Sequence, residues 1–179
     1  QRTATLQALQ QTAKKKQLIV TTIGAVIQKY VTPFRIRQTG ERLAAGRETS
    51  RERLASLLQS NGYFRVDTVA DAGEFAIRGS IVDLFPAGSE VGLRLDFFGD
   101  EIESIRRFNP SDQRSIDQVE HFDILPAVEA LMDEEAIKRF RTGYRERFGV
   151  TATGDPLYQA VSEGRRLSGM DHWLPLFEE

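Results

Sequence analysis

Residues 73–86 read GEFAIRGSIVDLFP, and residues 93–98 read LRLDFF. In both stretches apolar side chains alternate with polar or small ones, which is the period-two pattern of strands with one buried face. Short sequences that favour turns separate these stretches from their neighbours: Asp71-Ala72-Gly73, Pro86-Ala87-Gly88, Gly99-Asp100 and Asn109-Pro110. The spacing predicts an antiparallel sheet with one face in the core and the other open to water.

The segment before this sheet has a different pattern. Apolar residues recur at helical spacing over 6–13, and Leu18–Thr22 is a continuous apolar run typical of a buried parallel strand. A helix capped by Thr22 should follow, and its apolar face would consist of Ile23, Val26, Ile27 and Tyr30. A strand followed by a helix predicts one unit of an α/β layer.

A further helix is predicted between this unit and the sheet. Thr49 and Glu52 have the spacing of a capping box, and Asn61-Gly62 is a typical helix stop. We expect this helix to join the α/β segment to the strands.

Helical patterns return after Pro126. Asp133 is a plausible cap for a helix that Gly149 ends, and Asp155-Pro156 should begin another helix, which ends at Gly164. The chain thus reads as α/β, then all-β, then α. An α+β fold, with an antiparallel β module inserted into a larger α/β domain, explains this order best.

Composition excludes several classes of protein. The chain has 179 residues, of which 40% are hydrophobic and 28% charged, so a globular core is expected. It has no cysteine, which excludes disulfides, thiolate zinc sites and a cysteine nucleophile. The first residue is not methionine and no apolar targeting segment is visible, so we expect a piece of a longer cytoplasmic protein without a membrane span.

Charge is distributed unevenly along the sequence. Residues 1–63 contain eleven basic and three acidic side chains, whereas residues 64–125 contain six basic and thirteen acidic ones. Binding to nucleic acid requires clustered positive charge. If the chain touches DNA, it does so through the basic first third, where Lys14–Lys16 are candidates.

The inventory of reactive groups argues against catalysis. No glycine is followed by lysine, so the chain lacks the phosphate-binding loop of nucleotide hydrolases. His121 and His172 are isolated in sequence. Carboxylates such as Asp83, Asp96, Glu101 and Glu103 could pair as acid and base. Residues 64–125 contain thirteen acidic side chains, however, so such pairs are expected by chance. We therefore predict no enzyme activity, metal or cofactor for this chain.

Three stretches carry a family resemblance: residues 62–67 (GYFRVD), 73–86, and 94–105 (RLDFFGDEIESI). They closely resemble the UvrB-homology module of bacterial transcription-repair coupling factors. Residues 158–164 and 169–177 are also similar to those factors rather than to UvrB itself.

The resemblance implies a fold and a domain organisation. Residues 63–125 would be the inserted β module, and residues 1–62 and 126–179 would belong to an incomplete RecA-like α/β host domain without nucleotide-binding motifs. It also implies that this region recruits the excision-repair protein UvrA and has no catalytic role. RNA polymerase and DNA would be contacted by other parts of the longer protein, which has an ATP-driven motor.

The resemblance also implies site residues on the open face of the sheet. Those that match the shared motif for UvrA binding are Arg65, Arg78, Arg94, Asp96 and Phe98. UvrB has a further arginine where this chain has Ala76, so that contact is absent. In the family, a C-terminal domain of the same protein masks this face, which would make the contact autoinhibitory.

Structural interpretations also follow from the residues themselves. Arg94 and Asp96 could be surface partners across strands, worth only ~0.2–1 kcal/mol. Phe97 lies in step with Leu93 and Leu95 and is predicted to be core, which leaves its neighbour Phe98 for an interface. The apolar cluster around Trp173 is predicted to pack within the host domain.

Overall fold

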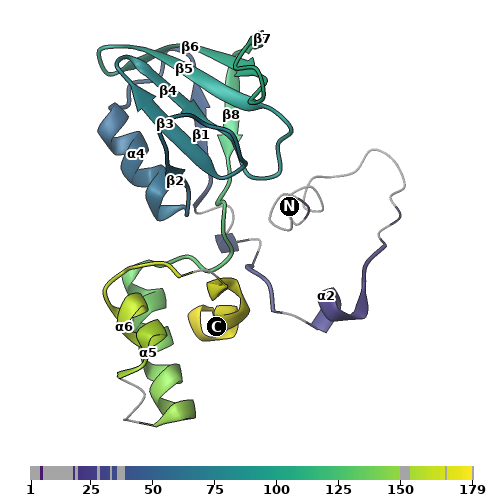
Figure 1. The fold of residues 1–179 in the computed structure, drawn as a ribbon, viewed down its shortest axis with the longest axis vertical. Helices are drawn as coiled ribbons and strands as arrows, with labels where there is room; N and C mark the ends of the chain where they lie inside the picture. The colour runs from purple at the N-terminus through teal and green to yellow at the C-terminus, as the bar shows by residue number, and fades with distance from the viewer. Residues whose placement is uncertain are drawn as a thin grey trace. The chain divides into compact units, whose positions relative to one another are not determined.

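The computed structural model describes residues 5, 18, 20–27, 29–32, 34–35, 39–149, 154–167 and 169–178. They fall into two compact units (Figure 1). The β unit takes in residues 33–128 and also 1–12, and the helical unit takes in residues 129–179 and also 13–32. Helices and sheets are both present, which confirms the predicted α+β class.

A six-stranded sheet dominates the β unit. Its order follows the sequence: β2 (Phe64–Arg65), β3 (Glu74–Arg78), β4 (Ile81–Leu84), β5 (Gly92–Phe98), β6 (Glu101–Phe108) and β7 (Ser115–Val119). The short β2 pairs parallel with β3, and all other neighbours are antiparallel. The turns predicted from glycine, proline, asparagine and aspartate separate the strands, so the antiparallel sheet is confirmed.

A second pair of strands and one helix complete the β unit. β1 (Glu41–Ala44) pairs antiparallel with β8 (His121–Ile124). Backbone hydrogen bonds between Ile102 of β6 and residues 46–47 connect this pair to the larger sheet. Figure 1 shows α4 (Arg51–Ser60) packed along the strands.

The start of α4 differs from the prediction by one residue. Ser50, not Thr49, is the N-cap: its backbone is extended and its hydroxyl accepts a hydrogen bond from the Arg53 amide at 3.1 Å. The Thr49 amide instead donates to the carbonyl of Asp100 at 2.7 Å, next to an isolated bridge between Glu48 and Glu101. This bridge keeps Thr49 out of the capping position.

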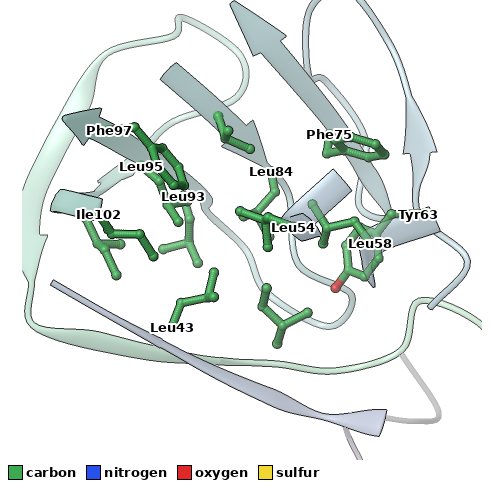
Figure 2. Close-up of a cluster of buried hydrophobic side chains, with 13 residues drawn as sticks. Leu43, Leu54, Leu58, Tyr63, Phe75, Leu84, Leu93, Leu95, Phe97 and Ile102 are labelled. Atoms are coloured by element: carbon green, nitrogen blue, oxygen red, sulfur yellow. The ribbon is translucent and has the colours of Figure 1, made fainter. Parts of the chain in front are cut away.

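One hydrophobic core lies between the sheet, α4 and the β1–β8 pair (Figure 2). The strands contribute Phe75, Leu84, Leu93, Leu95, Phe97 and Ile102, β1 contributes Leu43, and α4 contributes Leu54 and Leu58. Full burial of such a side chain is worth ~1.5–3 kcal/mol. The boundary at residue 62 between the host domain and the β module remains a prediction. β1 and α4 precede this residue and contribute to the core of the β unit.

The predicted buried strand at Leu18–Thr22 is wrong for the residues that the structure describes. Leu18 and Val20–Thr22 form no strand, and both Leu18 and Val20 are exposed. An apolar run becomes a buried strand only beside a pairing partner, and no described strand pairs with it. The helix after it is short, α2 (Ile23–Ile27), and Thr22 caps it by accepting from the Ala25 amide at 3.3 Å. The predicted helix over 6–13 and the lysines at 14–16 lie outside the described residues.

The helical unit agrees with its predicted caps. Asp133 caps α5 (Glu134–Phe148), which Gly149 ends, and Asp155 caps α6 (Pro156–Ser162). A 3-10 turn, η2 (Met170–Trp173), leads into α7 (Leu174–Phe177). The Trp173 ring contacts Tyr144 and Phe148 of α5 at 5.6 and 5.9 Å between centroids. In the described part of the chain, no helix combines the length and apolar character needed to cross a bilayer.

Candidate functional site

The face of the six-stranded sheet that points away from the core carries a row of charges, and we call it the outer face. Strand register brings its residues together in two rows. Ala76, Asp83, Arg94 and Arg106 are aligned across β3 to β6 in the first row. Arg78, Ile81, Asp96 and Ser104 are aligned across the same strands in the second.

A buried carboxylate lies at the centre of the outer face. Asp83 of β4 has an exposed fraction of 0%. The Nε of Arg94 donates to its Oδ1 at 2.7 Å, and the Nη2 of Arg94 donates to its Oδ2 at 2.9 Å. The Nη2 of Arg78 donates to the same Oδ2. One carboxylate thus joins two of the predicted site residues.

Sequence reasoning considered Asp83 only as one of several carboxylates that could pair by chance. A signal for its role was present, because Asp83 is the single charge in the apolar strand Ile81–Leu84. A carboxylate in such a strand needs a buried cation beside it, since an unpaired charge is costly to bury.

Arg94 is more deeply placed than the predicted open face suggests. Its side chain is 17% exposed, and its guanidinium lies over the ring of Phe108, with Cζ 4.8 Å from the centroid. Its Nη1 reaches the carbonyl of Gln113 at 3.4 Å. The hydrogen bond to Asp83 is the main cause that raises the pKa of Arg94 above its ordinary value, so this guanidinium stays charged.

Asp96 has its own partners on β6. Arg106 donates to Asp96 Oδ2 through Nη2, and the hydroxyl of Ser104 donates to the same oxygen at 3.0 Å. Arg94 and Asp96 are therefore not paired with each other, but each is paired across strands, as the structural alternative expects. They lie two residues apart on one strand, and each finds its partner on a neighbouring strand, as cross-strand geometry favours.

One end of the outer face, which we call the covered end, is not open to water. Here Val69, Ala76 and Phe108 form a small buried cluster against which Val66 and Phe85 pack. Gln113, in a left-handed conformation at φ 62°, donates to the carbonyls of Val69 and Pro110 at 2.9 and 2.8 Å. The open face predicted from the strand pattern is thus only half correct, because loops before β3 and after β6 cover this part.

Gly92 allows the covered end to close. It is aligned with Phe108 across β5 and β6, and a Cβ at this position would overlap the Phe108 ring. A glycine therefore lies where a ring must approach the neighbouring strand closely.

The other end of the outer face, which we call the exposed end, contains Arg78, Asp96, Phe98 and Arg106. The side chain of Arg78 is 48% exposed, and Phe98 is 81% exposed although it is a large apolar residue. Phe97, one residue earlier, is 5% exposed and lies in the core, as predicted. Arginine and aromatic side chains on one accessible surface are typical of protein-binding anchors.

Arg65 does not join this group. The register of β2 aligns Arg65 with Phe75, whose side chain is in the core, and aligns Phe64 with Glu74 instead. Arg65 therefore lies on the opposite face from Arg78, at the edge of the sheet. Phe64, which is exposed and aligned with the outer face, is the residue that sequence reasoning missed here.

Metal binding has no candidate site in the described ranges. No three histidine or carboxylate side chains among these residues are grouped to hold an ion. The absence of a cofactor remains a prediction.

Comparison with known families agrees with the strand pattern. Residues 42–129 match a family model described as the UvrB interaction domain. This matched region contains α4, β2 to β8 and all of β1 except Glu41, and the family description is that of an interaction domain.

Relatives that match most of this chain are transcription-repair-coupling factors. The chain is 46% identical over 132 residues to the protein of Escherichia coli strain K12, and this match covers 74% of this chain and 12% of that protein. It is 37% identical over 164 residues to the protein of Haemophilus influenzae, which covers 91% of this chain and 14% of that protein. The match to the Bacillus subtilis protein is 38% over 118 residues, which covers 65% of this chain and 10% of that protein.

This chain therefore spans only 10–14% of the length of these three relatives. Within that length, the domain match and the similarity to the relatives cover the same strands that carry the outer face. The chain belongs to the transcription-repair-coupling factor family and corresponds to an N-terminal region that contains the UvrB interaction domain.

Proposed function

We propose that this chain binds the excision-repair protein UvrA through the exposed end of the outer face and so recruits it to stalled RNA polymerase. The observation that carries the proposal is that Phe98 is exposed and that Arg78, which is half-exposed and ion-paired, lies on the same face of the sheet. Membership of the family supports UvrA as the partner, and the geometry supports this part of the sheet as the contact.

The exposed end has the composition of an interface centre. A phenylalanine that stays 81% exposed gains nothing from folding, so burial in a pocket of a partner would supply its stabilisation. Arg78 uses one terminal nitrogen on Asp83, and a guanidinium has five donors in a planar fork, so it can bind a second acceptor. Aromatic and arginine anchors of this kind dominate binding energies in protein complexes.

Regulation and the wider activity are further parts of the proposal. The same exposed end would be masked by a C-terminal domain of the longer protein, because an exposed aromatic anchor is a target for intramolecular docking as well as for UvrA. RNA polymerase and DNA would be contacted by other regions, which also hold the ATP-driven motor. The chain itself would act as an adaptor without catalysis.

Binding of the 179-residue chain to purified UvrA, measured by biolayer interferometry, tests the proposal. Phe98→Ala and Arg78→Ala should each weaken binding by about 30-fold, the loss expected for an anchor worth about 2 kcal/mol. Phe34→Ala and Arg107→Ala are matched controls. Phe34 is exposed and belongs to no strand, and Arg107 is 43% exposed and aligned with core-facing Leu93. Unchanged binding by the two exposed-end variants, with circular dichroism showing intact folds, would contradict the proposal.

A further inference from the structure

Two arginines share the carboxylate of Asp83, but they differ in what remains available to a partner. We propose that Asp83 is a positioning residue that holds the side chain of Arg78 ready for the partner protein, and that Arg94 affects binding only through Asp83. This inference rests on the proposed function of the exposed end and adds the device that prepares it.

The first step concerns Arg94, whose hydrogen-bonding groups are already used. Nε and Nη2 donate to the two oxygens of Asp83, and Nη1 and Nη2 point to the carbonyl and side-chain oxygen of Gln113 at 3.4 and 3.5 Å. One face of its guanidinium lies on Phe108. With 17% of its side chain exposed, Arg94 offers a partner little surface.

The second step concerns how the sheet accommodates the carboxylate of Asp83. A fully buried carboxylate without a cation would be strongly unfavourable, and a bidentate guanidinium is the best available partner. Arg94 therefore makes the burial of Asp83 possible. Its bidentate contact leaves Oδ2 free to accept a second donor from β3.

The third step concerns Arg78, which receives that second contact. Its side chain reaches Oδ2 of a residue that cannot move, because Asp83 is enclosed between β3 and β5. A long side chain that is already restrained loses less conformational entropy when it binds. Arg78 is 48% exposed, so it is held in place and still accessible.

A double-mutant cycle of UvrA binding tests this relation. Arg78→Ala should weaken binding by about 30-fold and Asp83→Asn by about 10-fold. If Asp83 acts through Arg78, the variant with both Arg78→Ala and Asp83→Asn should bind UvrA about 30-fold more weakly than the parent, not about 300-fold. The change at Asp83 has no further effect once the Arg78 side chain is absent. Arg94→Lys should likewise have an effect of less than about 2-fold in the Arg78→Ala background.

Two further variants control for folding and for the chemistry of the change. Asp117→Asn removes one partner of the exposed Arg107–Asp117 pair on the same sheet, and UvrA binding should not change. Asp83→Asn combined with Arg94→Gln removes both buried charges together, so no unpaired charge is left to unfold the sheet. This double variant should lose binding as Asp83→Asn does. If the Asp83 and Arg94 substitutions weaken UvrA binding by the same factor with and without Arg78→Ala, the proposal is overturned.

A readout without UvrA separates this proposal from the proposed function. Nitrogen-15 relaxation of the Arg78 Nε–H group should report a restrained side chain in the parent chain and a mobile one in Asp83→Asn with Arg94→Gln. Unchanged order of Arg78 in that variant would overturn the positioning role, whatever UvrA does. If the order falls as expected but Arg78→Ala binds UvrA as well as the parent, the proposed function fails for Arg78, and Asp83 restrains Arg78 without preparing it for UvrA.

Discussion

The two ends of the outer face use similar residues with opposite results. At the covered end, Arg94 lies on Phe108 and is bonded to Asp83 and Gln113, and loops exclude water from the ring. At the exposed end, Arg78 bonds only one oxygen of the same Asp83, and Phe98 points into solvent. An arginine and a phenylalanine are structural at one end and available at the other, and the difference comes from what surrounds them.

This contrast indicates that the covered end holds in place a carboxylate that the exposed end uses. The covered end supplies the buried counter-ion, the ring and the loop that hold Asp83 in place. The exposed end uses Asp83 without burying its own groups. Substitutions at the covered end should therefore mainly lower stability, and substitutions at the exposed end should mainly weaken binding.

The largest contrast in stability is expected between Phe97 and Phe98. Phe97→Ala removes a ring from the core and should lower the free energy of unfolding by about 4 kcal/mol. Phe98→Ala removes an exposed ring and should change it by less than about 0.5 kcal/mol. Urea denaturation followed by circular dichroism measures both. Comparable losses would mean that Phe98 is packed in solution and that the exposed end is not free.

The next largest contrast is expected between the two arginines. Arg94→Ala leaves Asp83 with only its contact to half-exposed Arg78, and should lower the free energy of unfolding by about 3 kcal/mol. Arg78→Ala leaves the bidentate pair intact and should cost about 1 kcal/mol. Equal losses in urea denaturation would show that both arginines have one structural role and would remove the distinction between the ends.

A smaller effect on stability is expected at alkaline pH, through the buried side chain of Tyr63. Burial raises the pKa of Tyr63 to about 12, and its hydroxyl donates to the carbonyl of Leu125 at 2.8 Å. The phenol ionises in the unfolded chain near pH 10, before it does so in the folded one, so stability is intact below pH 10 and falls as the pH rises toward 12. Between pH 10 and 11.5 the loss should be about 1.5 kcal/mol.

Tyr63→Phe isolates that contribution. The variant should be about 1 kcal/mol less stable than the parent at neutral pH, because it lacks the hydrogen bond to Leu125 and the longer one from the Ala87 amide. The difference should shrink and reverse as the pH rises above 10. Urea denaturation at several pH values gives both curves. A parallel decline of parent and variant would show that Tyr63 is not the group that responds.

Much of the fold could be predicted because alternation and turn residues are local signals. The apolar positions at Leu93, Leu95 and Phe97 and the caps at Asp133 and Asp155 follow from the nearest few residues. The strand predicted at Leu18–Thr22 required a neighbouring strand, and sequence alone cannot show whether one is present. The cap at Ser50 depended on a bridge to Glu101, which is 51 residues further along the chain.

The site was predictable only in part for the same reason. Alternation correctly placed Arg78, Arg94, Asp96 and Phe98 on one face. It could not show that β4 separates β3 from β5 and brings Asp83 between the arginines. It could not show which loops fold over the face, or that the parallel register of β2 turns Arg65 to the other side.

The outermost strand of the sheet, β7, has a consequence for the behaviour of the chain at high concentration. Four of its five residues are exposed, and among the described residues no strand lies beyond it, so its outer backbone groups could template pairing with another molecule. The strand is short, its one exposed large apolar residue is Ile116, and Asp117 carries a charge beside it. These features are typical of natural sheet edges that resist aggregation.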